Sequence, residues 1–232
     1  MNIKILLLFS VICAVVLAAC KKNNNDAPTT NLITYLNIVN ASPDTVNFYL
    51  NGTRLNSNSN LYPFLTSGYI SVLAGKQNYQ VKKAFNTTTS VVQPLFNIPL
   101  DLDTSSHYSY SLFIAGETQA QAFSTVDSVL TNTASNTCLV RFVNASPDSN
   151  KYDLAVGSAT KIAGKGFATS SSFLSADTGS MVPVILYQAG TTIQAATGTV
   201  ILLPQKAYTI YSTGKLNGTG SSKIGLAIMA NY

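Results

Sequence analysis

The segment Leu36-Asn37-Ile38-Val39-Asn40-Ala41-Ser42-Pro43-Asp44 decides the fold, because it returns as Val140-Arg141-Phe142-Val143-Asn144-Ala145-Ser146-Pro147-Asp148. Six of the nine positions are identical, at an offset of 104 residues. A Tyr-rich segment near the end of each copy also recurs, as Tyr110–Gly116 and Tyr208–Gly214. A spacing of this size is too long for a solenoid repeat and matches a β-sandwich domain of about 100 residues. The sequence therefore predicts two tandem domains, 32–131 and 137–232.

Short strands are expected throughout both copies. In the first copy, Asn51-Gly52 is typical of a type I′ hairpin, whose two central residues need positive φ. Tyr69–Leu73 and Tyr79–Ala84 flank Ala74-Gly75 and are expected to form a second hairpin. In the second copy, strands are predicted over 182–187, 200–203, 207–213 and 224–229. No window has a sustained helical period. The predicted fold class is therefore all-β, with two tandem immunoglobulin-like β-sandwich domains packed end to end.

The composition narrows the classes of function. Hydrophobic residues make up 46% of the chain and charged residues only 10%, against about 25% charged residues in a typical protein. Ser, Thr and Asn together account for 71 of the 232 residues. The chain is too hydrophobic for disorder, and three cysteines are too few for a disulfide scaffold. The basic residues are scattered, so a nucleic-acid partner is not expected.

The N-terminus is predicted to be a lipoprotein signal peptide over residues 1–19. Lys4 is followed by an apolar run that is too short for a comfortable transmembrane helix. The run closes on Leu17-Ala18-Ala19-Cys20, which resembles a lipobox. We expect cleavage before Cys20, lipidation of its thiol, and a flexible tether over 20–31. The membrane is therefore an expected partner through Cys20, and the expected location is the outer membrane, with both domains periplasmic or at the cell surface.

The repeated elements together resemble the DUF4397 family. The resemblance lies in the apolar strand ending in Asn-Ala-Ser-Pro-Asp, the Asn51-Gly52 hairpin, Ala74-Gly75, and the later Tyr-rich strand ending in Gly. It covers both copies, although Ala155-Val156-Gly157 stands in the second copy where the first has Asn51-Gly52. The resemblance implies secreted or lipid-anchored bacterial proteins with immunoglobulin-like sandwiches, and it supplies no catalytic residue.

The Asn-Ala-Ser-Pro-Asp motif is the main candidate site, because it occurs twice. Prolines preset φ for a turn, while Asp and Asn side chains can bond backbone groups there, so a structural role is expected. The alternative is a pair of ligand loops, but one carboxylate per loop is few for Ca²⁺, which needs six to eight oxygens. The candidate residues are Asn40, Ser42, Pro43, Asp44, Asn144, Ser146, Pro147 and Asp148.

Catalytic and metal sites are not expected. His107 is the one histidine, and no Gly-x-Ser-x-Gly elbow presents a nucleophile near it. Asp101 and Asp103 are expected to face water, and Cys138 is expected to be buried in a core strand. We therefore expect no cofactor, no metal and no enzymatic activity.

Two non-enzymatic functions remain open. The first is a structural or adhesive display module that meets envelope proteins. The second is a glycan- or nutrient-binding lipoprotein that serves a transporter. Exposed tyrosines in a concave groove would favour the second, whereas the absence of Trp counts against it.

Overall fold

The computed structural model describes residues 32–57, 59–84, 92–103, 108–127 and 134–231. Residues 32–232 form one compact unit. The predicted signal peptide, Cys20 and the tether lie outside the described residues. In the described ranges, no helix is long and apolar enough to cross a membrane.

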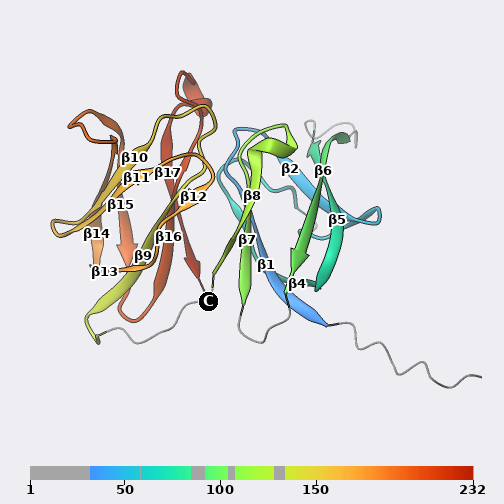
Figure 1. The fold of residues 1–232 in the computed structure, drawn as a ribbon, viewed down its shortest axis with the longest axis horizontal. Helices are drawn as coiled ribbons and strands as arrows, with labels where there is room; N and C mark the ends of the chain where they lie inside the picture. The colour runs from blue at the N-terminus through green and yellow to red at the C-terminus, as the bar shows by residue number, and fades with distance from the viewer. Residues whose placement is uncertain (1–31, 58, 85–91, 104–107, 128–133, 232) are drawn as a thin grey trace, which may run out of the picture. The chain divides into compact units, whose positions relative to one another are not determined.

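The first copy is a sandwich of two four-stranded sheets (Figure 1). The sheet that faces the second copy, called the inner sheet, has the order β4-β1-β7-β8, with β1 and β7 parallel. The outer sheet has the order β3-β2-β5-β6 and is antiparallel. The strands are β1 (Ile33–Asn40), β2 (Val46–Leu50), β3 (Thr53–Arg54), β4 (Thr66–Leu73), β5 (Gly75–Ala84), β6 (Val92–Leu102), β7 (Ser109–Ile114) and β8 (Ala122–Val126), with the 3-10 turn η1 (Gln119–Gln121) before β8.

The second copy repeats this plan. Its inner sheet has the order β12-β9-β16-β17, with β13 also on β9 and with β9 and β16 parallel. Its outer sheet has the order β11-β10-β14-β15. The strands are β9 (Thr137–Asn144), β10 (Tyr152–Val156), β11 (Thr160–Lys165), β12 (Thr169–Ser170), β13 (Leu174–Asp177), β14 (Gly179–Gln188), β15 (Gln194–Leu202), β16 (Ala207–Thr213) and β17 (Gly225–Asn231), with η2 (Gly220–Ser222) before β17. The all-β fold of two sandwiches is confirmed.

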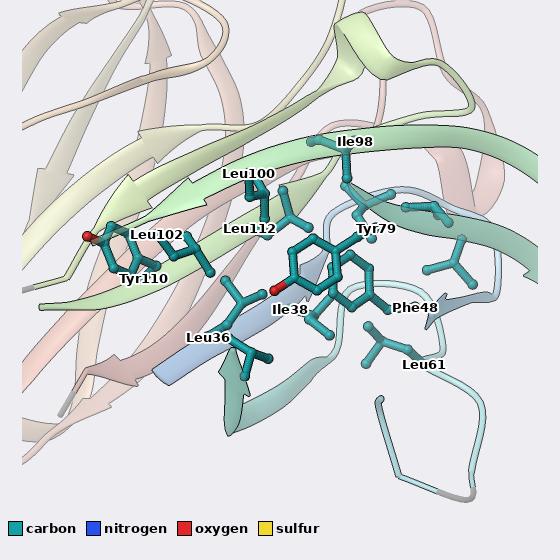
Figure 2. Close-up of a cluster of buried hydrophobic side chains, with 14 residues drawn as sticks. Leu36, Ile38, Phe48, Leu61, Tyr79, Ile98, Leu100, Leu102, Tyr110 and Leu112 are labelled. Atoms are coloured by element: carbon teal, nitrogen blue, oxygen red, sulfur yellow. The ribbon is translucent and has the colours of Figure 1, made fainter. Parts of the chain in front are cut away.

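Alternating apolar residues build one core inside each sandwich, as a two-residue side-chain period requires. In the first copy, Leu36 and Ile38 of the inner sheet meet Phe48 and Tyr79 of the outer sheet (Figure 2). The rings of Phe48 and Tyr79 stack with centroids 4.8 Å apart. In the second copy the core contains Val140, Phe142, Tyr152, Leu154, Val184, Leu186 and Ile210.

One predicted hairpin is confirmed and the other is wrong. Asn51 (φ 49°) and Gly52 (φ 81°) join β2 to β3 with the positive φ values of a type I′ turn. Ala74-Gly75 does not close a hairpin, because β4 pairs with β1 in the inner sheet and β5 pairs with β2 and β6 in the outer sheet. Gly75 (φ 81°) instead lies where the chain crosses between sheets.

The copies contact each other through the faces of their inner sheets rather than end to end. The second face of β1 and β7 is the one that points away from the first copy's own core. It contributes Val39 and Phe113, which pack against Val143 and Tyr211 of β9 and β16. All seven residues of β16 are buried, because one face lies in its own core and the other faces the first copy.

Candidate functional site

Asn40 organises the first copy of the repeated motif. Its side chain is fully buried, and its Nδ2 donates to the carbonyls of Asp44 (2.7 Å), Leu61 (3.0 Å) and Tyr62 (3.1 Å). Its Oδ1 accepts from the backbone N (3.1 Å) and Oγ (2.8 Å) of Ser42. The amide therefore joins the end of β1 to two later loops, and its hydrogen-bonding capacity is used within the protein.

Asn144 organises the second copy of the motif in the corresponding way. It is fully buried, and its Nδ2 donates to the Lys165 carbonyl at 3.0 Å. Its Oδ1 accepts from the backbone N of Ser146 (3.1 Å) and from Oγ of Ser212 (2.8 Å), while Ser146 Oγ donates to the Thr213 carbonyl at 3.0 Å. These hydrogen bonds favour a structural role for the motif.

The prolines and aspartates of the motif differ between the copies. Pro43 is partly exposed and Pro147 is buried. Asp44 accepts a salt bridge from Lys83 at 2.7 Å, and Lys83 also bonds Glu117. The lysine partner lowers the pKa of Glu117, and both carboxylates raise the pKa of Lys83 through hydrogen bonds. Asp148 is exposed with a positive φ of 61°, a conformation that Asp tolerates in turns.

The other sequence candidates do not form a reactive centre in the described ranges. His107 lies outside them, and so does Cys20. Cys138 is a free, fully buried thiol that contacts the Ala176 carbonyl at 3.6 Å, and burial raises its pKa. Asp101 and Asp103 are exposed. Among the described residues, no group of three His, Cys, Asp or Glu is placed to hold a metal ion.

A closed ring of polar side chains, all buried except the half-buried Tyr69, spans the two copies and was not predicted from the sequence. Asp127 is fully buried and pairs with Arg141, which is 3% exposed. Arg141 Nε donates to Thr209 Oγ1 (2.8 Å), Thr209 Oγ1 donates to Asn231 Oδ1 (2.7 Å), and Asn231 Nδ2 donates to Tyr69 OH (3.1 Å). Tyr69 OH donates back to Asp127 Oδ2 at 2.8 Å, and burial together with this carboxylate raises the pKa of Tyr69.

Further donors satisfy Asp127. Ser111 Oγ donates to its Oδ2 and Thr125 Oγ1 to its Oδ1, while Arg141 Nη1 donates to the Val126 carbonyl at 2.7 Å. The sequence carried one signal: Arg141 is a charge inside an apolar strand, at the repeat position where the first copy has the buried Asn37. Such a charge is buried only when it is paired.

The outer sheets of the two copies present different surfaces. On the first copy's outer sheet, Asn78, Lys82 and Asn97 alternate with buried core residues, so their side chains face outward. The corresponding face of the second copy presents Met181 and Ile201, which are 75% and 61% exposed. No Asp, Glu, Lys, Arg or His occurs between Asp177 and Lys206, the segment that forms β14 and β15.

A groove of about 460 Å³ lies on the same outer sheet of the second copy. Its lining includes Tyr187, Lys161, Gln194 and Asp153. The carboxylate of Asp153 already accepts from the backbone N of Gly164 (2.7 Å) and of Gly190 (2.9 Å), so it shapes the groove. Among the described residues, Tyr187 is the only tyrosine that lines this groove.

Comparison with known families decides the relationship of the chain. A family model described as a domain of unknown function, DUF4397, matches residues 34–143 and again residues 138–231. The chain belongs to the DUF4397 family. The two matches agree with the two copies, and the resemblance inferred from the repeated motif is confirmed. A comparison with curated proteins gives no match.

Solved structures resemble this DUF4397 protein only distantly. One is a family 26 carbohydrate-binding module from Eubacterium rectale in complex with maltoheptaose, at 11% identity and a TM-score of 0.24, covering 86% of this chain and 98% of the other. Another is a proposed cell adhesion protein from Bacteroides eggerthii, at 11% identity and a TM-score of 0.29, covering 85% and 95%. Since both scores are below 0.5, we infer no function from either protein.

Proposed function

We propose that this DUF4397 protein is a non-enzymatic, lipid-anchored protein-interaction module of the cell envelope, whose second copy carries the contact face. The observation that best supports this proposal is the difference between the two outer sheets. Met181 and Ile201 lie exposed on the neighbouring strands β14 and β15, which contain no charged residue, whereas the matching strand β5 of the first copy carries Lys76, Lys82 and Lys83. Neighbouring exposed apolar side chains are typical of surfaces that bind another molecule.

Three carboxylates that have protein partners support a role without catalysis. Asp127 is held by Arg141, Asp153 holds two loop amides, and Asp44 is paired with Lys83. A catalytic acid or base must be within reach of a substrate, and these groups are committed to protein contacts.

The lipid anchor belongs to the same proposal. A thiol-linked diacylglycerol at Cys20, followed by a polar tether, would hold the module beside the outer membrane. Cys20→Ala is expected to move the protein from the membrane fraction to the soluble fraction or to stall its processing. Unchanged membrane partitioning of this variant would contradict the anchor.

Binding of the unanchored protein, carrying Cys20→Ala in every variant, to isolated cell envelopes tests the contact face. Met181→Asp combined with Ile201→Asp places two charges on the apolar face, and envelope retention is expected to fall about ten-fold or more, as for loss of an interface anchor. The matched control is Asn78→Asp combined with Asn97→Asp on the first copy's outer sheet, which should leave retention unchanged. Equal retention of both variants would refute the proposed face.

The groove beside Tyr187 favours one second candidate, a glycan-binding function. A tyrosine flanked by Lys161, Gln194 and Thr191 offers a stacking surface with hydrogen-bonding groups at its rim. Binding to a glycan array that is lost in Tyr187→Ala and kept in Tyr62→Ala would support this function. Tyr62 is a suitable control because it is 51% exposed on the first copy.

A further inference from the structure

Edge strands of the two outer sheets differ in how they are protected. Natural sheet edges usually carry charges or prolines that prevent pairing with another chain. The edge strand β6 contains Pro94, Pro99 and Asp101, and the edge strand β11 contains Lys161 and Lys165. The short edge strand β3 contains Arg54.

β15 has neither form of protection. It occupies the position of β6 in the second copy, runs for nine residues, and contains no charged residue and no proline. Among the described residues, its only strand partner is β14. The register with β14 is regular from Ala196 to Val200 after an irregularity beside Gln194, and Thr197, Thr199 and Ile201 are exposed. This stretch therefore presents backbone groups that can pair with a further strand.

The charge distribution selects the occupant. The chain has a net charge of +5, and the outer sheet of the first copy and the β11 edge both carry lysines, so two copies would repel each other across those surfaces. The hairpin β14–β15 contains no charged residue, and Lys223 borders only its Gln194–Thr197 end. Two-fold antiparallel pairing about Thr199 would place the two Lys223 residues at opposite ends of the strand pair. An antiparallel strand pair is also self-complementary under a two-fold axis.

We infer that two copies of this protein associate by antiparallel pairing of their β15 strands, which joins the two outer sheets into one continuous sheet. The inference rests on the proposed function, because the β15 edge borders the proposed contact face and pairing would join two such faces. Thr199 lies at the centre of Ala196–Leu202, so it is expected to lie near the two-fold axis. Ile201 of each chain would then lie near Thr197 of the other.

Disulfide trapping of the full chain in its native membranes tests the pairing. Thr197→Cys, Thr199→Cys and Ile201→Cys are oxidised separately, and homodimers are read on a non-reducing gel. Directly opposite residues of an antiparallel pair have Cβ atoms close enough for a disulfide. At least one variant is expected to give about ten-fold more dimer than collision does, because paired strands raise the effective thiol concentration.

Asn97→Cys on β6 is the matched control. The parent chain, without an added cysteine, shows how much dimer forms through the native cysteines. The described part of the chain has one native thiol, the buried Cys138. No homodimer from any β15 variant, or an equal amount from Asn97→Cys, would overturn the inference. Adducts of another mass would also overturn it, while leaving the proposed function intact. Loss of envelope retention in the Met181 and Ile201 variant remains the separate test of that function.

Discussion

Asp127 and Arg141 show what a single pair of residues contributes at the boundary between the copies. Each is almost completely buried, and each has its remaining hydrogen-bonding groups satisfied by Tyr69, Ser111 or Thr209. A buried ion pair tolerates replacement of both partners far better than removal of one. The pair is therefore a strong constraint on how the copies meet.

Arg141→Ala leaves the Asp127 carboxylate buried without its cation, so the free energy of unfolding is expected to fall by about 3–5 kcal/mol. Lys83→Ala is the control, because its salt bridges to Asp44 and Glu117 are partly exposed and such pairs contribute about 1 kcal/mol or less. Urea unfolding monitored by tyrosine fluorescence measures both. Similar losses in the two variants would contradict the structural role of the ring.

Tyr79 offers a prediction of the opposite sign. Its hydroxyl is buried in the first core and has no hydrogen-bond partner among the described residues (Figure 2). Tyr79→Phe is expected to raise the free energy of unfolding by about 1 kcal/mol at pH 7, because it removes an unsatisfied polar group. Tyr211→Phe, which loses a bond to the Phe64 carbonyl (3.0 Å), should instead lower it.

The Tyr79 prediction extends to alkaline pH. Burial raises the pKa of Tyr79 from 10.0 to about 12. Below pH 10 the hydroxyl is neutral in both the folded and unfolded chain; between pH 10 and pH 12 the unfolded chain ionises first, so folding weakens as pH rises. The advantage of Tyr79→Phe over the parent should therefore grow across this window in urea titrations. An advantage that stays constant or shrinks across this window would contradict the raised pKa of the buried hydroxyl.

Some residues of the buried polar networks could be predicted from the sequence and others could not, for a physical reason. Asn40 and Asn144 could be found because they recur in a fixed motif. Tyr69, Asp127 and Asn231 could not, because they come together only through pairing of distant strands, and isolated polar residues are common in strands. Arg141 was the one member whose local context was unusual.

At the scale of elements, glycines show which turns depend on the absence of a side chain. Gly214 ends the Tyr-rich strand β16 with a φ of +76°, and a Cβ there would collide with the backbone of Ser222 and Lys223. Gly116, at the matching place in the first copy, would meet only the side chain of Gln121. The glycine shared by the two copies is thus obligatory in the second and more replaceable in the first.

Gly214→Ala is expected to lower the free energy of unfolding by about 3 kcal/mol, since backbone strain and a steric clash act together. Gly52→Ala is the control: it has a φ of +81° but open space around it, so it should lose only about 1–2 kcal/mol. Thermal unfolding followed by circular dichroism compares the two. Equal losses would show that the loop over η2 moves aside.

Elements could be predicted better than their pairing. Strands were predicted over 182–187, 207–213 and 224–229, where β14, β16 and β17 lie, and Asn51-Gly52 located a hairpin. Ala74-Gly75 misled because a glycine with positive φ serves a crossover between sheets as well as a hairpin, and local sequence does not distinguish them.

At the scale of the whole molecule, the two copies share a buried boundary. The second faces of β1, β7, β9 and β16 meet through an apolar cluster that includes Val39, Phe113, Val143 and Tyr211, and through the polar ring around Asp127. The end-to-end arrangement expected from the sequence did not account for these second faces. We therefore expect one cooperative unfolding transition in calorimetry of the full chain. Separation of the halves after cleavage at an engineered protease site near Ser135 would contradict this.

The proposed contact face predicts that the second copy's outer sheet is covered by a partner in the native envelope. Met181→Cys and Asn78→Cys place one thiol on the matching faces of the two copies, and a small maleimide labels them in permeabilised cells and in dilute purified protein. We predict that Met181→Cys is labelled about ten-fold more slowly in cells than when purified, because a contact partner covers it, while Asn78→Cys reacts alike in both. Equal labelling of Met181→Cys in cells and in purified protein would contradict the proposed contact face.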